Sequence, residues 1–122
     1  LGKSLRGAHI LLAGVAYKKN VDDTRETPAF VLIESLEERG ATVDYYDPYV
    51  PVIPRTRDHG HLAGRKSIEW ALEHVGNYDA TLICTDHDAV DYEELVRASN
   101  LIIDTRNAVG EINGFQHRVI KA

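Results

Sequence analysis

HILLAGV, at residues 9–15, is a compact apolar run of the kind found in strands that are buried on both faces of a parallel sheet. Other elements of the fold must cover such a strand on both faces. The residues that follow predict what covers it, because a polar stretch leads into a helix pattern and the helix pattern leads into a second strand, Thr42–Tyr46.

The helix between these two strands has recognisable ends. Thr27 is predicted as its N-cap, and Pro28 takes the first helical position, where a missing N–H group costs nothing. Gly40 stands where a left-handed residue ends a helix. Spacings of three and four residues predict one apolar stripe and a wet side for this helix. The stripe comprises Ala29, Val31, Leu32, Ser35 and Leu36, and the wet side comprises Glu34, Glu37, Glu38 and Arg39.

Further strands and helices alternate along the rest of the chain. Asp47 and Pro48 end the second strand, and Tyr49–Lys66 is predicted as a long, irregular surface connection. The remaining elements are a helix Ile68–Val75 that Ser67 caps and that turns Trp70, Ala71 and Val75 inward, a buried strand Ala80–Cys84, a helix from Asp91 or Tyr92 to Ala98, a strand Leu101–Asp104, and a weak strand near Arg118–Lys121.

This alternation predicts an α/β fold, a small doubly wound, Rossmann-like parallel sheet with helices on both faces. Residues 1–122 suffice for one domain with a single core. The chain begins with Leu1 and contains no methionine, so we expect it to be a piece of a longer protein, with processing of a small protein as the alternative.

Bulk properties exclude several classes of protein. The net charge of −5 argues against a nucleic-acid surface, and no apolar run approaches the ~20 residues that span a membrane. The first residues also show no pattern of a secretory leader. The one cysteine, Cys84, cannot form an internal disulfide, so a reducing, cytoplasmic location is expected. Because Cys84 lies in a predicted core strand, we interpret it as a small buried hydrophobic residue and not as a reactive thiol.

In open α/β sheets, ligands bind outside the carboxyl ends of the strands. Three polar segments should meet at that edge, at Tyr17–Arg25, Thr85–His87 and Asp104–Asn107. In the first, the cations Lys18, Lys19 and Arg25 suit a phosphate. Acidic neighbours offset them, however, so their spacing slightly favours a solvated loop; these neighbours are Asp22, Asp23 and Glu26.

The other candidates are also ambiguous. Arg106 could grip a phosphate or pair with a neighbouring acid, and the residues favour neither reading. Thr85–Asp88 fits a polar turn that caps the next helix better than a metal or acid–base site, and His59 and His61 are expected to be exposed and without partners. Gly14 lacks the second and third glycines of a dinucleotide fingerprint, so this domain is not expected to cradle NAD by itself.

Four segments together resemble the C-terminal, nucleotide-sugar-binding domain of the UDP-glucose/GDP-mannose dehydrogenase family. The longest, GVAYKKNVDDTRETPA at residues 14–29, is similar to the family's G-x-[AS]-[FY]-K-x-x-x-x-D-x-R-x-[ST]-x-A signature. YDPYVP at residues 46–51, TDH at 85–87 and DTRN at 104–107 resemble three further family segments in the same order. The resemblance covers essentially the whole chain.

The resemblance implies a function and a set of roles. Family members oxidise C6 of a nucleotide sugar with NAD. By carry-over, Tyr17, Lys18 and Arg106 would bind the substrate, and Arg25 would reach the cofactor, which the absent N-terminal domain would mainly hold. The family's catalytic cysteine segment has no counterpart here, so no catalytic residue and no metal ligand is assigned. The implied partners are a UDP-sugar and the N-terminal and central domains of a dimeric or larger parent enzyme of surface-polysaccharide synthesis.

The substrate and two other functions stay open at this point. Tyr17 and the stretch Val21–Asp23 look closer to the branch that oxidises UDP-N-acetyl-hexosamines than to UDP-glucose or GDP-mannose dehydrogenases. A receiver-like regulatory module and a free-standing nucleotide-binding protein are the alternatives from other classes. The acid pair Asp22 and Asp23 suggests a receiver, but a receiver's acid pair closes its first strand, whereas this pair lies several residues beyond it.

Overall fold

The computed structural model describes residues 6–16, 27–56, 59–69, 72–85, 87, 90–104 and 119–121. Within these ranges a parallel five-stranded sheet runs in the order β2-β1-β3-β4-β5. Its strands are β1 (His9–Ala13), β2 (Thr42–Tyr46), β3 (Ala80–Ile83), β4 (Ile102–Asp104) and β5 (Val119–Lys121).

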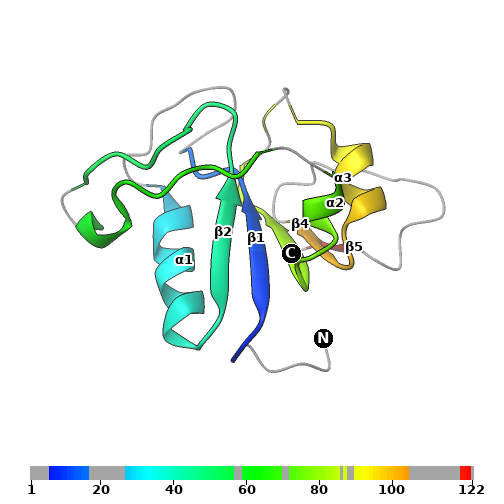
Figure 1. The fold of residues 1–122 in the computed structure, drawn as a ribbon, viewed down its shortest axis with the longest axis horizontal. Helices are drawn as coiled ribbons and strands as arrows, with labels where there is room; N and C mark the ends of the chain where they lie inside the picture. Colours follow the sequence, from blue (N-terminus) through cyan, green and yellow to red (C-terminus); the bar gives the residue numbers. More distant parts are fainter. Residues whose placement is uncertain are drawn as a thin grey trace.

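Helices cover both faces of this sheet, as the sequence predicted. Helix α1 (Pro28–Glu38) lies on one side, and α2 (Leu72–Val75) and α3 (Tyr92–Ala98) lie on the other (Figure 1). Alternate residues of β1 enter different cores: Ile10 and Leu12 pack with α1, whereas Leu11 packs with α2 and α3. The doubly wound α/β fold class is therefore confirmed.

Helix α1 begins as predicted, and the face that it presents to the core overlaps the predicted stripe only in part. The Thr27 side chain accepts a hydrogen bond from the Ala29 N–H at 3.3 Å, and Gly40 adopts a φ of +95° after the helix ends. The buried residues are Ala29, Phe30 and Ile33, whereas Val31 is 59% exposed. The predicted stripe was right for Ala29, Leu32 and Leu36, which lie in the core or pack against it, but wrong for Val31. The core side extends instead to Phe30, because the chain after β2 packs there and the rings of Phe30 and His59 meet edge to face.

The connection 49–66 is long and irregular, as we expected, but some of its apolar residues are anchored in the core of the domain. Ile53 and Leu62 are fully buried in the α1 core, and Leu62 ends a short 3-10 helix, η1 (Gly60–Leu62). Two carboxylates of α1 hold this connection. Glu37 receives two hydrogen bonds from Arg65, at 2.8 and 2.9 Å, and Glu34 contacts His59 and His61. Half of the predicted wet side of α1 is therefore a polar contact surface, whereas Glu38 and Arg39 are exposed as predicted.

Ser67 is not the helix cap that its position indicated. Its hydroxyl oxygen accepts a hydrogen bond from the Asp47 N–H at 2.9 Å, and residues 68 and 69 are not helical. The helix here is shorter than expected, α2 at Leu72–Val75, although Val75 is buried as predicted. Trp70 and Ala71 lie outside the described residues.

The remaining elements lie close to their predicted positions. Asp91 caps α3, since its side chain accepts a hydrogen bond from the Glu94 N–H at 3.1 Å, and β5 pairs with β4 as the closing strand. Strands β1 and β3 end one or two residues earlier than predicted. None of the helices in the described part of the chain has the length and apolar character to cross a bilayer.

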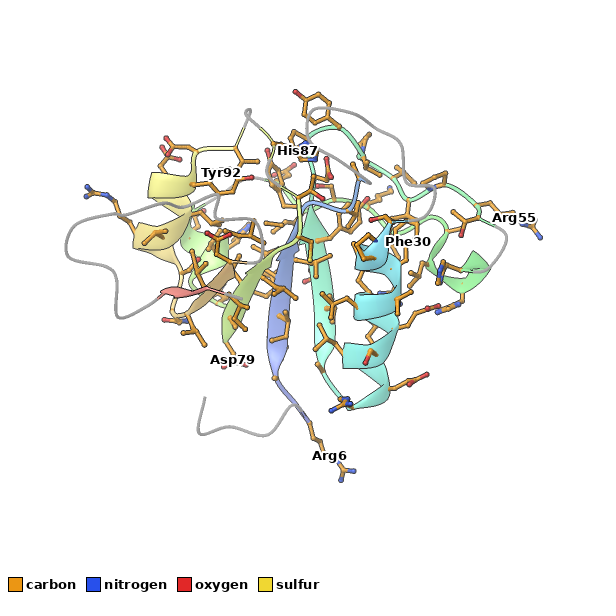
Figure 2. The ribbon with its side chains drawn as sticks, turned by 180° about the vertical axis from the view of Figure 1, so that it is seen from behind. Arg6, Phe30, Arg55, Asp79, His87 and Tyr92 are labelled. Carbon is orange, nitrogen blue, oxygen red and sulfur yellow. The ribbon has the colours of Figure 1, made fainter. Side chains whose placement is uncertain are left out.

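The strand order places a switch point between β1 and β3. The chain leaves β1 toward β2 on one side, and β3, β4 and β5 follow on the other side. At such a point the loops diverge and leave room for a ligand. Figure 2 shows His87 at this end of the sheet and Asp79 at the opposite end. The carboxyl ends of β1, β2 and β3 are therefore the place to search for a site.

Gly14 allows the β1 and β3 chains to approach each other at this point. It has a φ of +90°, and a Cβ atom there would lie 2.5 Å from the Thr85 Cβ and 2.8 Å from the Thr85 nitrogen. We expect Gly14→Ala to lower the free energy of unfolding by about 3 kcal/mol, because backbone strain and overpacking add. Urea denaturation of the variant measures this loss.

Gly64→Ala is the matched control. Gly64 has a nearly equal φ of +89°, but a Cβ atom added to it would meet nothing within 4 Å. Only the backbone strain remains there, so a loss of about 1 kcal/mol is expected. Equal losses at the two positions would contradict the close approach of Gly14 to Thr85.

Candidate functional site

The carboxylate of Asp47, directly after β2, joins the ends of three strands. Its Oδ2 accepts hydrogen bonds from the N–H groups of Val15 at 2.8 Å and Ala16 at 3.1 Å, which follow β1. The same oxygen lies 2.9 Å from Nε2 of His87, which follows β3. Its Oδ1 accepts a fourth hydrogen bond, from the Tyr49 N–H at 2.8 Å.

His87 is the buried partner of this carboxylate. Both side chains have an exposed fraction of 0%. The Tyr49 ring packs against the imidazole, with ring centroids 4.8 Å apart. The backbone N–H of His87 donates to the Tyr92 hydroxyl at 2.9 Å. Tyr92 is the first residue of α3, so the hydrogen bond from His87 also ties the start of that helix to the carboxyl edge of the sheet.

At Asp47 the hydrogen bonds together affect the pKa of the carboxyl group more than desolvation does. Burial by itself raises the pKa of this carboxyl group, but the hydrogen bonds from His87, Val15 and Tyr49 lower it below its usual value. Asp47 is therefore ionised at neutral pH and can only accept hydrogen bonds, so the Nε2 atom of His87 donates to it. A buried carboxylate with four donors is fully satisfied, which makes this junction rigid.

Thr85 adds a second link between the ends of β1 and β3. Its hydroxyl donates to the Ala16 carbonyl at 2.8 Å, and its N–H donates to the Ala13 carbonyl at 3.3 Å. Residues 14–16 are thus held from both sides, by Asp47 and by Thr85. The Asp47–His87 pair has the composition of an acid–base dyad, but its complete burial separates it from solvent, so it acts as a scaffold for the segments that leave this edge.

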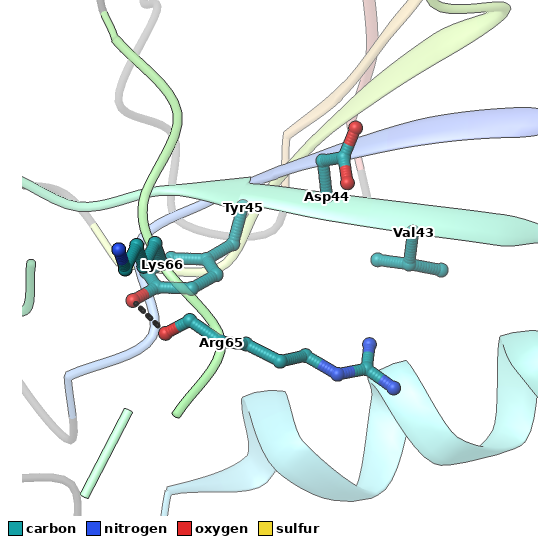
Figure 3. Close-up of a pocket in the computed structure, with 5 residues that line it drawn as sticks. All are labelled: Val43, Asp44, Tyr45, Arg65 and Lys66. Carbon is teal, nitrogen blue, oxygen red and sulfur yellow. Dashed lines mark hydrogen bonds between the residues drawn. The ribbon is translucent and has the colours of Figure 1, made fainter. Parts of the chain in front are cut away.

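A separate hollow lies beside β2 (Figure 3). It has a volume of about 320 Å³ and is lined by Val43, Asp44, Tyr45, Arg65 and Lys66. The Tyr45 hydroxyl shares its one hydrogen between the carbonyls of Val50, at 2.8 Å, and Arg65, at 3.2 Å. Burial, together with the charge of Asp47, raises the pKa of Tyr45 to about 12. Two of the three charged side chains that line the hollow already have hydrogen-bonding partners.

Those pairs argue against a ligand site in the hollow. The Asp44 carboxylate accepts a hydrogen bond from the Tyr78 hydroxyl at 2.7 Å, and the Arg65 guanidinium is engaged by Glu37. The hollow also lies beside the edge strand and not at the β1/β3 switch point. The junction around Asp47 is therefore the stronger candidate.

The structure brings together only part of the predicted site. Tyr17, Lys18, Arg25 and Arg106, the residues assigned to substrate and cofactor, all lie outside the described residues. The segments that carry them begin at the edge described above, because Ala16 precedes Tyr17 and the buried Asp104 ends β4. Their roles stay predictions.

Three readings of the polar candidates can be checked. The turn at Thr85 does not cap α3, because Asp91 does so and His87 is buried against Asp47. His59 and His61 were expected to be exposed and without partners. His61 is exposed and His59 is half-buried, and each lies 2.8 Å from an oxygen of Glu34. Cys84 is 8% exposed, which confirms its burial. No metal-binding cluster occurs among the residues that the structure describes.

Sequence reasoning missed the role of Asp47. It was interpreted only as the residue that ends β2, although it belongs to one of the four recognised segments. A signal was available: an acid directly after one buried strand and a histidine just after another must lie at the same edge of a parallel sheet. Nothing in the sequence indicated that they touch.

The chain is similar to known proteins over most of its length. A family model described as "UDP-glucose/GDP-mannose dehydrogenase family, UDP binding domain" matches residues 11–111. A UDP-glucose 6-dehydrogenase of Rhizobium meliloti (strain 1021) is 32% identical in an alignment of 111 residues that covers 87% of this chain and 24% of that protein. The chain thus spans about a quarter of the length of this relative.

Solved structures give the same result. A UDP-D-ManNAc dehydrogenase from Pyrococcus horikoshii aligns over 97% of this chain and 26% of its own, with a TM-score of 0.70 and 30% identity. An NDP-N-acetyl-D-galactosaminuronic acid dehydrogenase from Methanosarcina mazei Go1 aligns over 99% of this chain and 25% of its own, with a TM-score of 0.73 and 26% identity.

The Asp47 junction makes stability depend on pH. We expect Asp47→Asn to lower the free energy of unfolding at pH 7 by about 3 kcal/mol, because the amide cannot accept all four hydrogen bonds. The folded pKa of Asp47 is lowered, so the contribution of its charge to the free energy of unfolding is complete above the unfolded pKa of about 3.9 and is lost as pH falls through the folded value.

Urea denaturation of both proteins between pH 7 and pH 3 should show the difference between their free energies of unfolding shrinking below about pH 4. A difference that stays constant over this range would show that the Asp47 charge does not stabilise the fold.

Proposed function

This chain belongs to the UDP-glucose/GDP-mannose dehydrogenase family, and we propose that it is the domain that holds the nucleotide sugar in an NAD-dependent UDP-sugar 6-dehydrogenase. The observation that carries the proposal is the match of the family's UDP-binding domain to residues 11–111, which contain all four recognised segments in full. The α/β sheet with a switch point between β1 and β3 supports it, since this is where such folds bind nucleotides.

Within this proposal, Tyr17, Lys18 and Arg106 bind the UDP-sugar, and Arg25 reaches toward the cofactor. A lysine ammonium and an arginine fork suit the diphosphate and hydroxyl groups of such a ligand. The described residues support this assignment indirectly. Ala16 is held by Asp47 and by Thr85, so the segment that starts at Tyr17 leaves the sheet from a fixed point.

The oxidation itself we assign to a longer protein. The chain spans about a quarter of its relatives' length, so an N-terminal NAD-binding domain, a central domain and the catalytic cysteine would lie outside these 122 residues. NAD does not fit the turn after β1, because the N–H groups of Val15 and Ala16 already bind the Asp47 carboxylate and a pyrophosphate there would meet a second negative charge. Residues 1–122 alone are then expected to be inactive, and the parent enzyme to be a dimer or larger.

For the sugar, we propose a UDP-N-acetyl-hexosamine. Tyr17 and the stretch Val21–Asp23 support this choice through their resemblance to that branch. UDP-glucose is the second candidate, since similar relatives at about 30% identity are named for UDP-glucose and for UDP-D-ManNAc.

Binding of UDP to this chain tests the proposal directly. We expect weak binding, since half of the cleft is absent, and we expect Lys18→Ala and Arg106→Ala each to reduce the affinity about tenfold through the loss of a charge-assisted hydrogen bond. An NMR titration of the ¹⁵N-labelled chain with UDP measures both. Lys66→Ala is the matched control, because Lys66 is an exposed cation beside β2, away from the switch point. Failure of the unmodified chain to bind UDP, or equal effects of all three substitutions, would contradict the assignment.

A further inference from the structure

The turn after β1 directs two successive N–H groups at one oxygen. Val15 and Ala16 donate to Oδ2 of Asp47 at 2.8 and 3.1 Å, and Nε2 of His87 lies 2.9 Å from the same atom. Successive backbone N–H groups that converge in this way form a concave site for anions. The atom they surround belongs to an ionised carboxylate that is 0% exposed.

The position of this turn in the fold indicates what kind of site it forms. In doubly wound sheets the first turn between strand and helix is the one whose N–H groups hold the phosphates of a nucleotide. Here that turn lies at the β1/β3 switch point, and the chain's own carboxylate fills it from β2. An ordinary turn motif does not account for this contact. The local hydrogen bond between Asp47 and Tyr49 uses Oδ1, whereas the donors from β1 and β3 converge on Oδ2.

We infer that Asp47 is an internal anion that occupies an oxyanion site formed by Val15 N–H, Ala16 N–H and His87, and that removal of its carboxylate opens this site to a small carboxylate from solution. The inference does not rest on the proposed function, since it concerns a contact within the described residues. It has one consequence for ligands: the β1 turn of the unmodified chain is closed to phosphate, so a nucleotide must be held by other groups along this edge.

Chemical rescue tests the inference. Asp47→Ala removes three heavy atoms, Cγ and both carboxylate oxygens, and formate carries the same three atoms. We expect the variant to melt below the unmodified chain in 0.5 M sodium chloride. In 0.5 M sodium formate its melting temperature should rise by roughly 5 °C, as for a ligand that binds the folded state with a dissociation constant of about 50 mM.

Two controls separate the site from a general salt effect. The unmodified chain and Asp44→Ala should each melt at nearly the same temperature in the two salts; Asp44 is an exposed carboxylate in β2, the strand that Asp47 follows, and it accepts a hydrogen bond from Tyr78. In a ¹⁵N spectrum of Asp47→Ala, formate should move the Val15 and Ala16 amide signals, which it leaves in place in the unmodified chain.

A second measurement covers the case in which Asp47→Ala does not fold in either salt. The same two salts are then compared in the presence of 1 M trimethylamine N-oxide, an osmolyte that favours the folded state because it is excluded from the protein surface. Rescue by formate, with movement of the Val15 and Ala16 signals, supports the inference. Equal shifts in all proteins, or no rescue by formate with or without the osmolyte, would overturn it.

Discussion

A single buried negative charge sets the geometry of the carboxyl edge. A carboxylate removed from water is costly unless donors replace the lost solvent, and each of those donors must then be held in place. At Asp47 the donors come from the end of β1, from the end of β3 and from the chain after β2. Satisfying one group therefore aligns three strand ends that the hydrophobic cores alone would leave free to shift.

Polar contacts also decide the shape of the α1 side of the molecule. The connection after β2 inserts Ile53 and Leu62 into the core, and these apolar anchors are flanked by the pairs of Arg65 with Glu37 and of His59 with Glu34. The Asp47 N–H, bonded to Ser67, ties the far end of the same connection to the site. The carboxyl edge and the packing over α1 are therefore parts of one connected structure.

This scaffold separates two tasks that a dinucleotide-binding domain combines in its first turn. In such domains the glycine-rich turn both shapes the backbone and touches the phosphates. Here Gly14 performs the first task alone, by allowing the β1 and β3 chains to approach at Thr85. The donors that would touch a phosphate instead bind Asp47. Membership of a family that binds nucleotide sugars is compatible with this, because the segments assigned to ligand binding start beyond the turn.

The sequence by itself determined the class of fold, the order of strands and helices along the chain, and the edge of the sheet where a site is expected. These follow from local properties: apolar runs of strand length, the Thr27–Pro28 start of α1, the glycine at its end, and the alternation that implies a parallel sheet. The family resemblance followed in the same way, from short segments read in order.

Tertiary structure alone decided which face of α1 is buried, how the connection after β2 packs, and that Asp47 meets His87. These two residues stand 40 positions apart, and each has an ordinary local explanation, as the end of a strand and as part of a polar turn. Side-chain pairing across such a distance depends on how the loops close over the sheet. Periodicity describes one element at a time and contains no information about that closure.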